Sequence, residues 1–204
     1  MMNITPTVKQ LLIINIIFFI GSMLVPQTQV LLALYPPQSD HFRIWQLVTH
    51  MFMHGGFTHI FFNMFALYSF GSVLEHFWGT KKFLFFYFSC GLGAALMQMG
   101  ANYYELHSIL VNAADLNLSS ETLRQILNTN FFEVTPNGTI ARPDLFQEGI
   151  RPILEKAGKL NLVNSDNITA LYNAAISSQS PMVGASGAIP LFHTKHGRGV
   201  QWTA

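Results

Sequence analysis

Residues 49–71 read THMFMHGGFTHIFFNMFALYSFG. The stretch holds His50, His54, His59 and Asn63 in a segment that is otherwise largely apolar and that contains no Asp, Glu, Lys or Arg. An imidazole or an amide inside a bilayer costs about 1–3 kcal/mol or more unless it has a hydrogen-bonding partner. Four such side chains in one short segment therefore indicate a role beyond packing.

The composition of the chain is typical of a membrane protein. Its 204 residues suggest one domain with room for an insertion. Half of the residues (50%) are hydrophobic, 10% are charged and 18 are Phe, a balance too apolar for an ordinary soluble domain. The formal net charge of +1 excludes a broad basic surface, so nucleic acid is not expected as a partner. The single cysteine, Cys90, lies in an apolar run and is expected to be a buried, inert thiol.

Three segments are apolar enough to cross a lipid bilayer. The first, 11–25 with the flanking 8–10, reaches the length of about 17–20 residues that a spanning helix needs. A cleavable signal peptide is the alternative, but the following Pro-Gln-Thr does not resemble a cleavage site. The second candidate is 57–78 and the third is 83–104. Between the first two spans, 31–45 is expected to form an interfacial loop with its aromatic residues at headgroup depth.

The lysines predict how the chain is oriented. Lys81 and Lys82 follow Gly79 and are expected to form a tight turn between the second and third spans. Positively charged residues near the ends of spans favour the cytoplasmic side. Together with Lys9 they predict a multi-pass protein of the plasma (inner) membrane with a cytoplasmic N-terminus.

Residues 105–180 differ in kind from the apolar spans. They carry eight acidic and five basic residues, with Asn, Ser and Thr throughout, and they predict a soluble insertion on the outer face. Gly158 is placed to end one helix, and Ser165 or Asp166 to cap the next. The short helical patterns lie at 120–127, 143–157 and 166–176.

Apolar character returns at 182–192. At 1.5 Å per residue these positions give roughly 16 Å of helix, about half of a bilayer core, and Pro190 lies inside them. Ser186 follows Pro181, the point where the chain re-enters from the outer insertion, by five residues. It is therefore expected in the outer half of its helix.

The serine lies at the predicted depth of two polar side chains of the second span. His59 and Asn63 are four residues apart, so they share a helix face, and both fall in the outer half of that span. Ser186 could attack a carbonyl while His59, Asn63 and its own backbone N–H stabilise the oxyanion. Each donor of this kind is worth about 2.7–4 kcal/mol in the transition state. The reaction also needs a general base for the serine proton.

Other interpretations compete with this one. Gly-Ala-Ser-Gly at 184–187 is also a small-residue surface for helix packing, and a lone His59 could be a satisfied interior group. His50 and His54 have the i, i+4 spacing of a metal-binding pair, although no Glu follows the first of them as in H-E-x-x-H. Gly-Gly at 55–56 is expected to break the helix and to separate these two histidines from the face of His59.

Taken together, these residues resemble the rhomboid family of intramembrane serine proteases. The matching runs are WQLVTHMFMHGGFTHIFFN at 45–63 and GASG at 184–187. The resemblance implies an all-α polytopic membrane protein, a rhomboid-like helical bundle with about four of six core helices recognisable. It divides the chain into membrane helices one to three at 1–104, a soluble insertion loop at 105–180, the start of helix four at 181–192 and an atypical tail at 193–204.

The resemblance also implies a function. The family cleaves transmembrane protein substrates within the lipid bilayer, without ATP, metal or another cofactor. By this resemblance Ser186 is the nucleophile, His59 and Asn63 are the oxyanion donors, and His54 supports the structure around the site.

The chain departs from the family pattern after Pro190. The family takes its catalytic base from an Ala-His-x-x-Gly motif on helix six, which this sequence lacks, and His193 and His196 fall toward the opposite side of the membrane. The chain is therefore expected to be truncated and nearly inactive as written. Two alternatives stay open, a non-catalytic rhomboid-like scaffold that binds transmembrane clients and a metal protein that uses His50 and His54.

Overall fold

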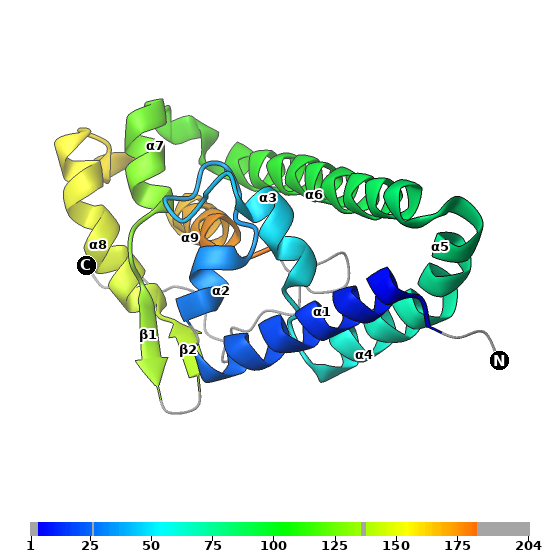
Figure 1. The fold of residues 1–204 in the computed structure, drawn as a ribbon. Coiled ribbons are helices and arrows are strands. Elements are labelled where there is room, and N and C mark those ends of the chain that lie inside the picture. The colour runs from blue at the N-terminus through cyan, green and yellow to red at the C-terminus, as the bar shows by residue number, and fades with distance from the viewer. Residues whose placement is uncertain (1–3, 26, 136–137, 183–204) are drawn as a thin grey trace. The chain divides into compact units, whose positions relative to one another are not determined.

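The computed structural model describes residues 4–25, 27–135 and 138–182 (Figure 1). The described part is almost entirely helical, which confirms the predicted all-α membrane fold. It forms two compact units. The first, called the membrane unit, comprises 4–25, 27–35, 41–99 and 181–182, and the second, called the insertion unit, comprises 36–40, 100–135 and 138–180.

Three helical segments are long and apolar enough to cross a membrane. They confirm the three predicted spans, because a continuous apolar run of this length can satisfy its backbone in lipid only as a helix. The third is longer than expected. The segments are α1 (Pro6–Leu24); α4 (Phe57–Ala66), the π-helical η2 (Leu67–Gly71) and α5 (Ser72–Trp78); and α6 (Thr80–Leu110) with the 3₁₀ helix η3 (Val111–Leu116).

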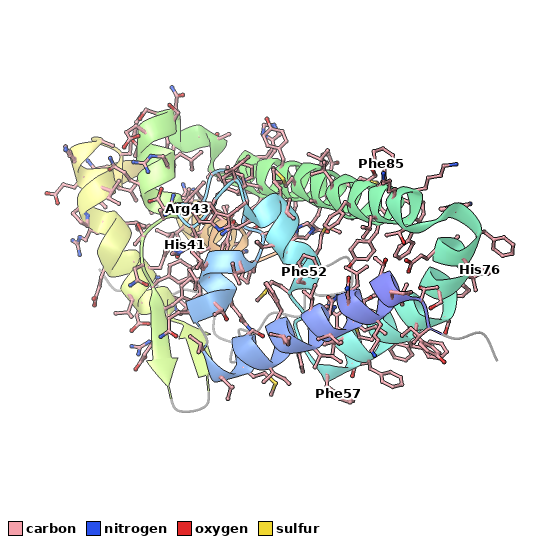
Figure 2. All side chains as sticks on the ribbon, in the orientation of Figure 1. His41, Arg43, Phe52, Phe57, His76 and Phe85 are labelled. Atoms are coloured by element: carbon pink, nitrogen blue, oxygen red, sulfur yellow. The ribbon has the colours of Figure 1, made fainter. Side chains whose placement is uncertain are left out.

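The outer surfaces of these helices carry large apolar side chains. Phe57 is 74% exposed and Phe85 is 77% exposed, and both project away from the ribbon in Figure 2. Such a surface is costly in water and favourable in lipid. Cys90 is also exposed, so the expectation of a buried thiol is wrong. It lines a cavity of the membrane unit.

The connection between α5 and α6 is tighter than predicted. Gly79 has φ +76°, a left-handed conformation that glycine adopts without strain. Lys81 and Lys82 lie in the first turn of α6 and not in a turn of their own. The single left-handed glycine therefore reverses the chain between the second and third spans.

A buried carboxylate joins three helices of the membrane unit. Glu75 on α5 is 5% exposed. It accepts hydrogen bonds from the Val8 N–H of α1 at 3.2 Å and from the Thr80 hydroxyl of α6 at 2.7 Å. An unpaired carboxylate would be expensive here, so the two donors fix how the helix ends meet.

The loop between the first two spans contains three short helices. They are α2 (Gln27–Leu32), α3 (Gln46–Thr49) and the 3₁₀ helix η1 (His50–Phe52). Tyr35 is buried, and burial raises the pKa of its phenol to about 12. Trp45 stays half-exposed and donates its indole N–H to the Leu31 carbonyl at 3.0 Å. The loop therefore packs on protein through Tyr35, which was expected at the headgroups.

The insertion unit has a hydrophobic core of its own. Its helices are α7 (Ser120–Leu127), α8 (Pro143–Lys156), the 3₁₀ helix η4 (Leu160–Leu162) and α9 (Ser165–Gln179). An antiparallel hairpin, β1 (Phe132–Thr135) and β2 (Gly138–Ala141), was not predicted. The fully buried core side chains are Leu116, Ile126, Phe131, Phe146, Ile150, Leu154, Ile168 and Leu171.

The ends of the insertion helices partly match expectation. Gly158 has φ +68° directly after α8, as expected for a residue that ends a helix. The cap of α9 is Asn164, whose side chain accepts the N–H groups of Asp166 and Asn167 at 2.9 Å. The prediction of Ser165 or Asp166 as the cap is therefore wrong by one or two residues. The longest segment of the insertion unit begins at residue 100, inside α6.

Candidate active site

The membrane unit contains a cavity of about 480 Å³. His50, His54, His59 and Asn63 all line it. The remaining wall is mostly apolar and comes from α1, η1, η2, α5 and α6. The four polar side chains of residues 49–71 named above therefore line one cavity within this unit.

The glycine pair brings two histidines together instead of separating them. Gly55 and Gly56 are not helical, and α4 begins directly after them. The rings of His54 and His59 nevertheless pack with their centroids 5.0 Å apart. The break was predicted correctly but its consequence was not, because the chain turns at the glycines and packs the two imidazoles against each other at an interplanar angle of 60°.

His59 and Asn63 occupy successive turns of α4. His59 is half-buried and Asn63 is exposed, and both line the cavity. An imidazole and a carboxamide each carry N–H groups that can donate to a developing negative charge. The same helix therefore presents two candidate donors to one space.

His50 and His54 are held as neutral side chains. His54 is 5% exposed, and its Nδ1 lies 3.3 Å from the Phe52 carbonyl. Burial and, to a smaller extent, the adjacent His59 lower the pKa of His54 to about 4. Burial also lowers the pKa of His50, whose Nδ1 donates to the Gln46 carbonyl at 2.8 Å. Both imidazoles are therefore uncharged at pH 7.

The described residues give the metal alternative no third ligand. Across 4–25, 27–135 and 138–182, no group of three or more His, Cys, Asp or Glu side chains is placed to hold a metal ion. His50 and His54 also use their Nδ1 atoms for backbone carbonyls. The described residues that line the cavity include no Asp or Glu.

Ser186 lies outside the described residues, as do its flanking Gly184 and Gly187. The chain that leads to it is described as far as Met182, four residues earlier. The Met182 N–H donates to the Leu34 carbonyl at 2.6 Å, and both side chains are buried in a small apolar cluster with Ala95. The segment that carries the predicted nucleophile therefore starts on the loop between the first two spans.

Gln46 organises this loop, and the sequence analysis gave it no role. It is fully buried. Its Nε2 donates to the His41 carbonyl at 3.0 Å and to the Val30 carbonyl at 3.3 Å. Its Oε1 accepts the N–H groups of Arg43 at 3.1 Å and Tyr35 at 3.3 Å. A lone amide between Trp and Leu in an apolar run was the pattern that could have revealed it.

Comparison with known proteins finds similarity to one protein family. Residues 41–111 match the family model of the Rhomboid domain, a range that contains the four cavity-lining polar residues. No solved structure matches the chain.

Three relatives are named as rhomboid proteases. Rhomboid-like protease 1 of Toxoplasma gondii is 31% identical over 94 residues, 45% of this chain and 31% of the relative. Rhomboid-like protease 3 of the same organism is 30% identical over 96 residues, 46% of this chain and 36% of the relative. Rhomboid protease GluP of Bacillus subtilis is 35% identical over 52 residues, 26% of this chain and 10% of the relative.

The chain thus spans about a third of the length of the two Toxoplasma relatives it matches. The matched Rhomboid domain at residues 41–111 contains His50, His54, His59 and Asn63 of the cavity lining. With three apolar helices, and with residues 41–111 similar to the Rhomboid domain of these relatives, the chain is an integral membrane protein that carries a rhomboid-like segment.

Proposed function

We propose that the cavity is the active site of a rhomboid-type intramembrane serine endopeptidase. Ser186 is the nucleophile, and His59 and Asn63 donate to the oxyanion. The observation that carries this proposal is the shared cavity of His59 and Asn63, on a helix inside the matched Rhomboid domain.

The proposed roles follow from the chemistry of acyl transfer. The Ser186 oxygen forms a bond to the scissile carbonyl carbon, and the carbonyl electron pair moves to oxygen to give a tetrahedral oxyanion. His59 and Asn63 N–H groups stabilise that charge, most strongly where water is excluded. The oxyanion collapses, the amine leaves with a proton, and water then releases the acyl group from Ser186. A general base must take the serine proton at the start and return it to the amine.

His54 has a positioning role in this scheme. Its pKa of about 4 makes it too weak a base to hold a proton at pH 7. Its ring instead packs against His59 and limits the orientations of that imidazole. A donor that is already oriented requires no rearrangement when the oxyanion forms.

The walls of the cavity suit an apolar polypeptide. Phe70, Phe83 and Phe86 line it beside the polar side chains. We therefore propose transmembrane protein segments as substrates. We further propose that the protein lies in the plasma membrane with a cytoplasmic N-terminus, since Lys9, Lys81 and Lys82 then fall on the cytoplasmic side.

Labelling with a fluorophosphonate probe tests the proposal. Covalent uptake of the probe by membranes that contain the protein, lost in Ser186→Ala, would support a competent protease. Ser120→Ala, at an exposed serine of the insertion unit, is the matched control and should label like the wild type. Absence of labelling together with co-purification of transmembrane clients would instead support the scaffold alternative.

A further inference from the structure

We propose that the junction of α1, α5 and α6 is a binding site for an anionic phospholipid. Lys81 and Lys82 of α6 hold its headgroup, and Lys9 of α1 adds positive charge at the same end of the helices. The site lies within the membrane unit. It is independent of the proposed protease function, because none of these lysines lines the cavity.

Hydrogen bonds fix the ends of three helices at this junction. The Thr7 hydroxyl of α1 donates to the Thr80 hydroxyl of α6 at 3.4 Å, and Glu75 of α5 accepts hydrogen bonds from both of these helices. Lys9 follows Thr7 by two residues, and the two lysines of α6 directly follow Thr80. In Figure 1 the start of α1 accordingly lies beside the connection from α5 to α6. The three lysines are therefore carried by backbone that meets at one end of the membrane unit.

The membrane unit offers these lysines no exposed carboxylate. Glu75 is the only Asp or Glu among the described residues of the unit, and it is 5% exposed. Its carboxylate already accepts from a backbone N–H of α1 and from the Thr80 hydroxyl. The ion pairs found in the described part of the chain involve only arginines. The positive charge at the junction is therefore available to an external anion.

The depth of the junction in the membrane favours a lipid as that anion. The lysines lie at the start of two apolar spans, Pro6–Leu24 and Thr80–Leu116. The first residues of such spans lie at the level of the lipid headgroups. Phe77 and Trp78, directly before the connection to α6, are 76% and 43% exposed, as expected for aromatic side chains at a membrane interface. The anion present in quantity at this depth is the phosphodiester of a phospholipid.

The helix ends make a smaller contribution. Both α1 and α6 begin at the junction, and neither has an acidic residue in its first turn. The N-terminus of a helix carries a partial positive charge, so these two ends attract an anion. The C-terminus of α5 lies at the same junction and carries the opposite partial charge. The lysines therefore supply most of the attraction.

The lysine pair of α6 predicts a preference among lipids. Lys81 and Lys82 are both exposed, and a lysine can lay its alkyl stem on apolar surface while its ammonium group stays at the water boundary. Each lysine near an anionic membrane surface raises the affinity about fivefold. In a phosphatidylcholine headgroup the choline cation cancels the phosphate charge, whereas phosphatidylglycerol carries a net negative charge. The site should therefore distinguish these two lipids.

The test is a lipid titration of the full chain in detergent, followed by native mass spectrometry. Phosphatidylglycerol and phosphatidylcholine with the same acyl chains are the two probes. Lys81→Gln/Lys82→Gln should weaken binding of phosphatidylglycerol by about 25-fold, fivefold for each lysine, and leave binding of phosphatidylcholine unchanged. Arg151→Gln/Lys156→Gln, at two exposed cations of α8, is the matched control and should bind both lipids like the wild type.

Two further comparisons identify what the site recognises. Lys81→Arg/Lys82→Arg keeps both charges and should retain the preference for phosphatidylglycerol. Millimolar glycerol 3-phosphate, which presents a phosphate without acyl chains, should not displace the lipid. Displacement by glycerol 3-phosphate would mean that the site takes a soluble phosphate ester, and equal binding of the two lipids by the wild type would mean that it does not select an anion. Either result would overturn the proposal.

Thermal unfolding shows whether a loss of binding is a loss of the site or of the fold. Without added lipid, Lys81→Gln/Lys82→Gln should have the Tm of the wild type, because both side chains are exposed. Added phosphatidylglycerol should raise the Tm of the wild type and of the arginine variant but not of the glutamine variant. An equal rise in all three proteins would contradict the assignment of the two lysines. Neither measurement uses Ser186, so a protein that binds the lipid but takes up no fluorophosphonate would keep this site and lose the protease assignment.

Discussion

The ring of His54, which is buried, packs at a tilt against the half-buried ring of His59. Two imidazolium rings at this separation would repel each other, and burial further penalises the charge on His54. The arrangement is therefore stable only while His54 is neutral. This makes His54 the residue through which acid should weaken the membrane unit.

Stability should fall in acid because of His54. The unfolded imidazole takes up a proton near pH 6.5, but the folded one does so only near pH 4. The contribution of neutral His54 is thus complete above pH 6.5 and is lost as the pH falls toward 4. Thermal unfolding in detergent should show a lower Tm at pH 4.5 than at pH 7, with a shallower decline in His54→Gln. His76→Gln, at an exposed histidine, is the control, and equal slopes in all three proteins would contradict the prediction.

The oxyanion donors should contribute separately to reactivity. His59→Ala and Asn63→Ala should each slow fluorophosphonate labelling of Ser186 by about 10²–10³-fold, the usual cost of one lost donor. The Tm of Asn63→Ala should change little, because Asn63 is exposed. A labelling rate within twofold of the wild type in Asn63→Ala would remove this residue from the proposed site.

Sequence patterns were sufficient to predict the bounds of elements that are defined by the length of an apolar run or by polar periodicity. The second span was predicted at 57–78 and is observed as Phe57–Trp78, and α7 was predicted at 120–127 and observed there. Apolar run length and polar periodicity act locally, so they can be read from neighbouring residues. The hairpin of the insertion unit was missed because its strands are only four residues each.

Contacts between elements could not be predicted from the sequence. His59 and Asn63 were singled out as candidate site residues because their types and spacing are unusual in an apolar helix. Gln46 and Glu75 act through partners far along the chain, so their spacing carried no information about them. The turn of the chain at Gly55–Gly56 likewise depends on what packs around it.

Glu75 should be a main determinant of how the helix ends assemble. Glu75→Ala leaves the Val8 N–H and the Thr80 hydroxyl without their acceptor. The expected cost is about 1–3 kcal/mol in the free energy of unfolding, measured by denaturant titration in mixed micelles. Glu148→Ala, at an exposed carboxylate, is the control and should stay within about 0.5 kcal/mol. Similar losses of unfolding free energy in both variants would show that Glu75 contributes no more to stability than an exposed carboxylate does.

Two glycines of α6 offer a matched test of packing against η1. A Cβ at Gly91 would overlap the Met51 side chain, whereas a Cβ at Gly93 meets nothing within 4 Å. Gly91→Ala should destabilise the membrane unit by about 1–3 kcal/mol and displace Met51, next to His50. Gly93→Ala should be neutral or stabilising by up to about 1 kcal/mol. Thermal unfolding in detergent measures both, and equal Tm values would contradict the close packing.

At the level of the whole molecule, the chain builds two cores of different kinds. The membrane unit exposes aromatic surface and buries few side chains completely, as expected where lipid is the solvent. The insertion unit buries eight large side chains completely and exposes its charges, as a soluble domain does. The two units should therefore respond differently to the same kind of substitution.

Leu154→Ala should unfold the insertion unit selectively. Leu154 is fully buried in the core of that unit, and truncation of such a leucine costs about 2–5 kcal/mol. Leu162→Ala is the matched control, because Leu162 is 53% exposed. Amide exchange in α7, α8 and α9 should rise strongly in Leu154→Ala and not in Leu162→Ala, while α1, α4 and α6 up to residue 99 stay protected. Because residues 36–40 belong to the insertion unit, exchange at the loop tip should rise together with α7. Equal loss of protection in α1 would mean that the two cores unfold as one.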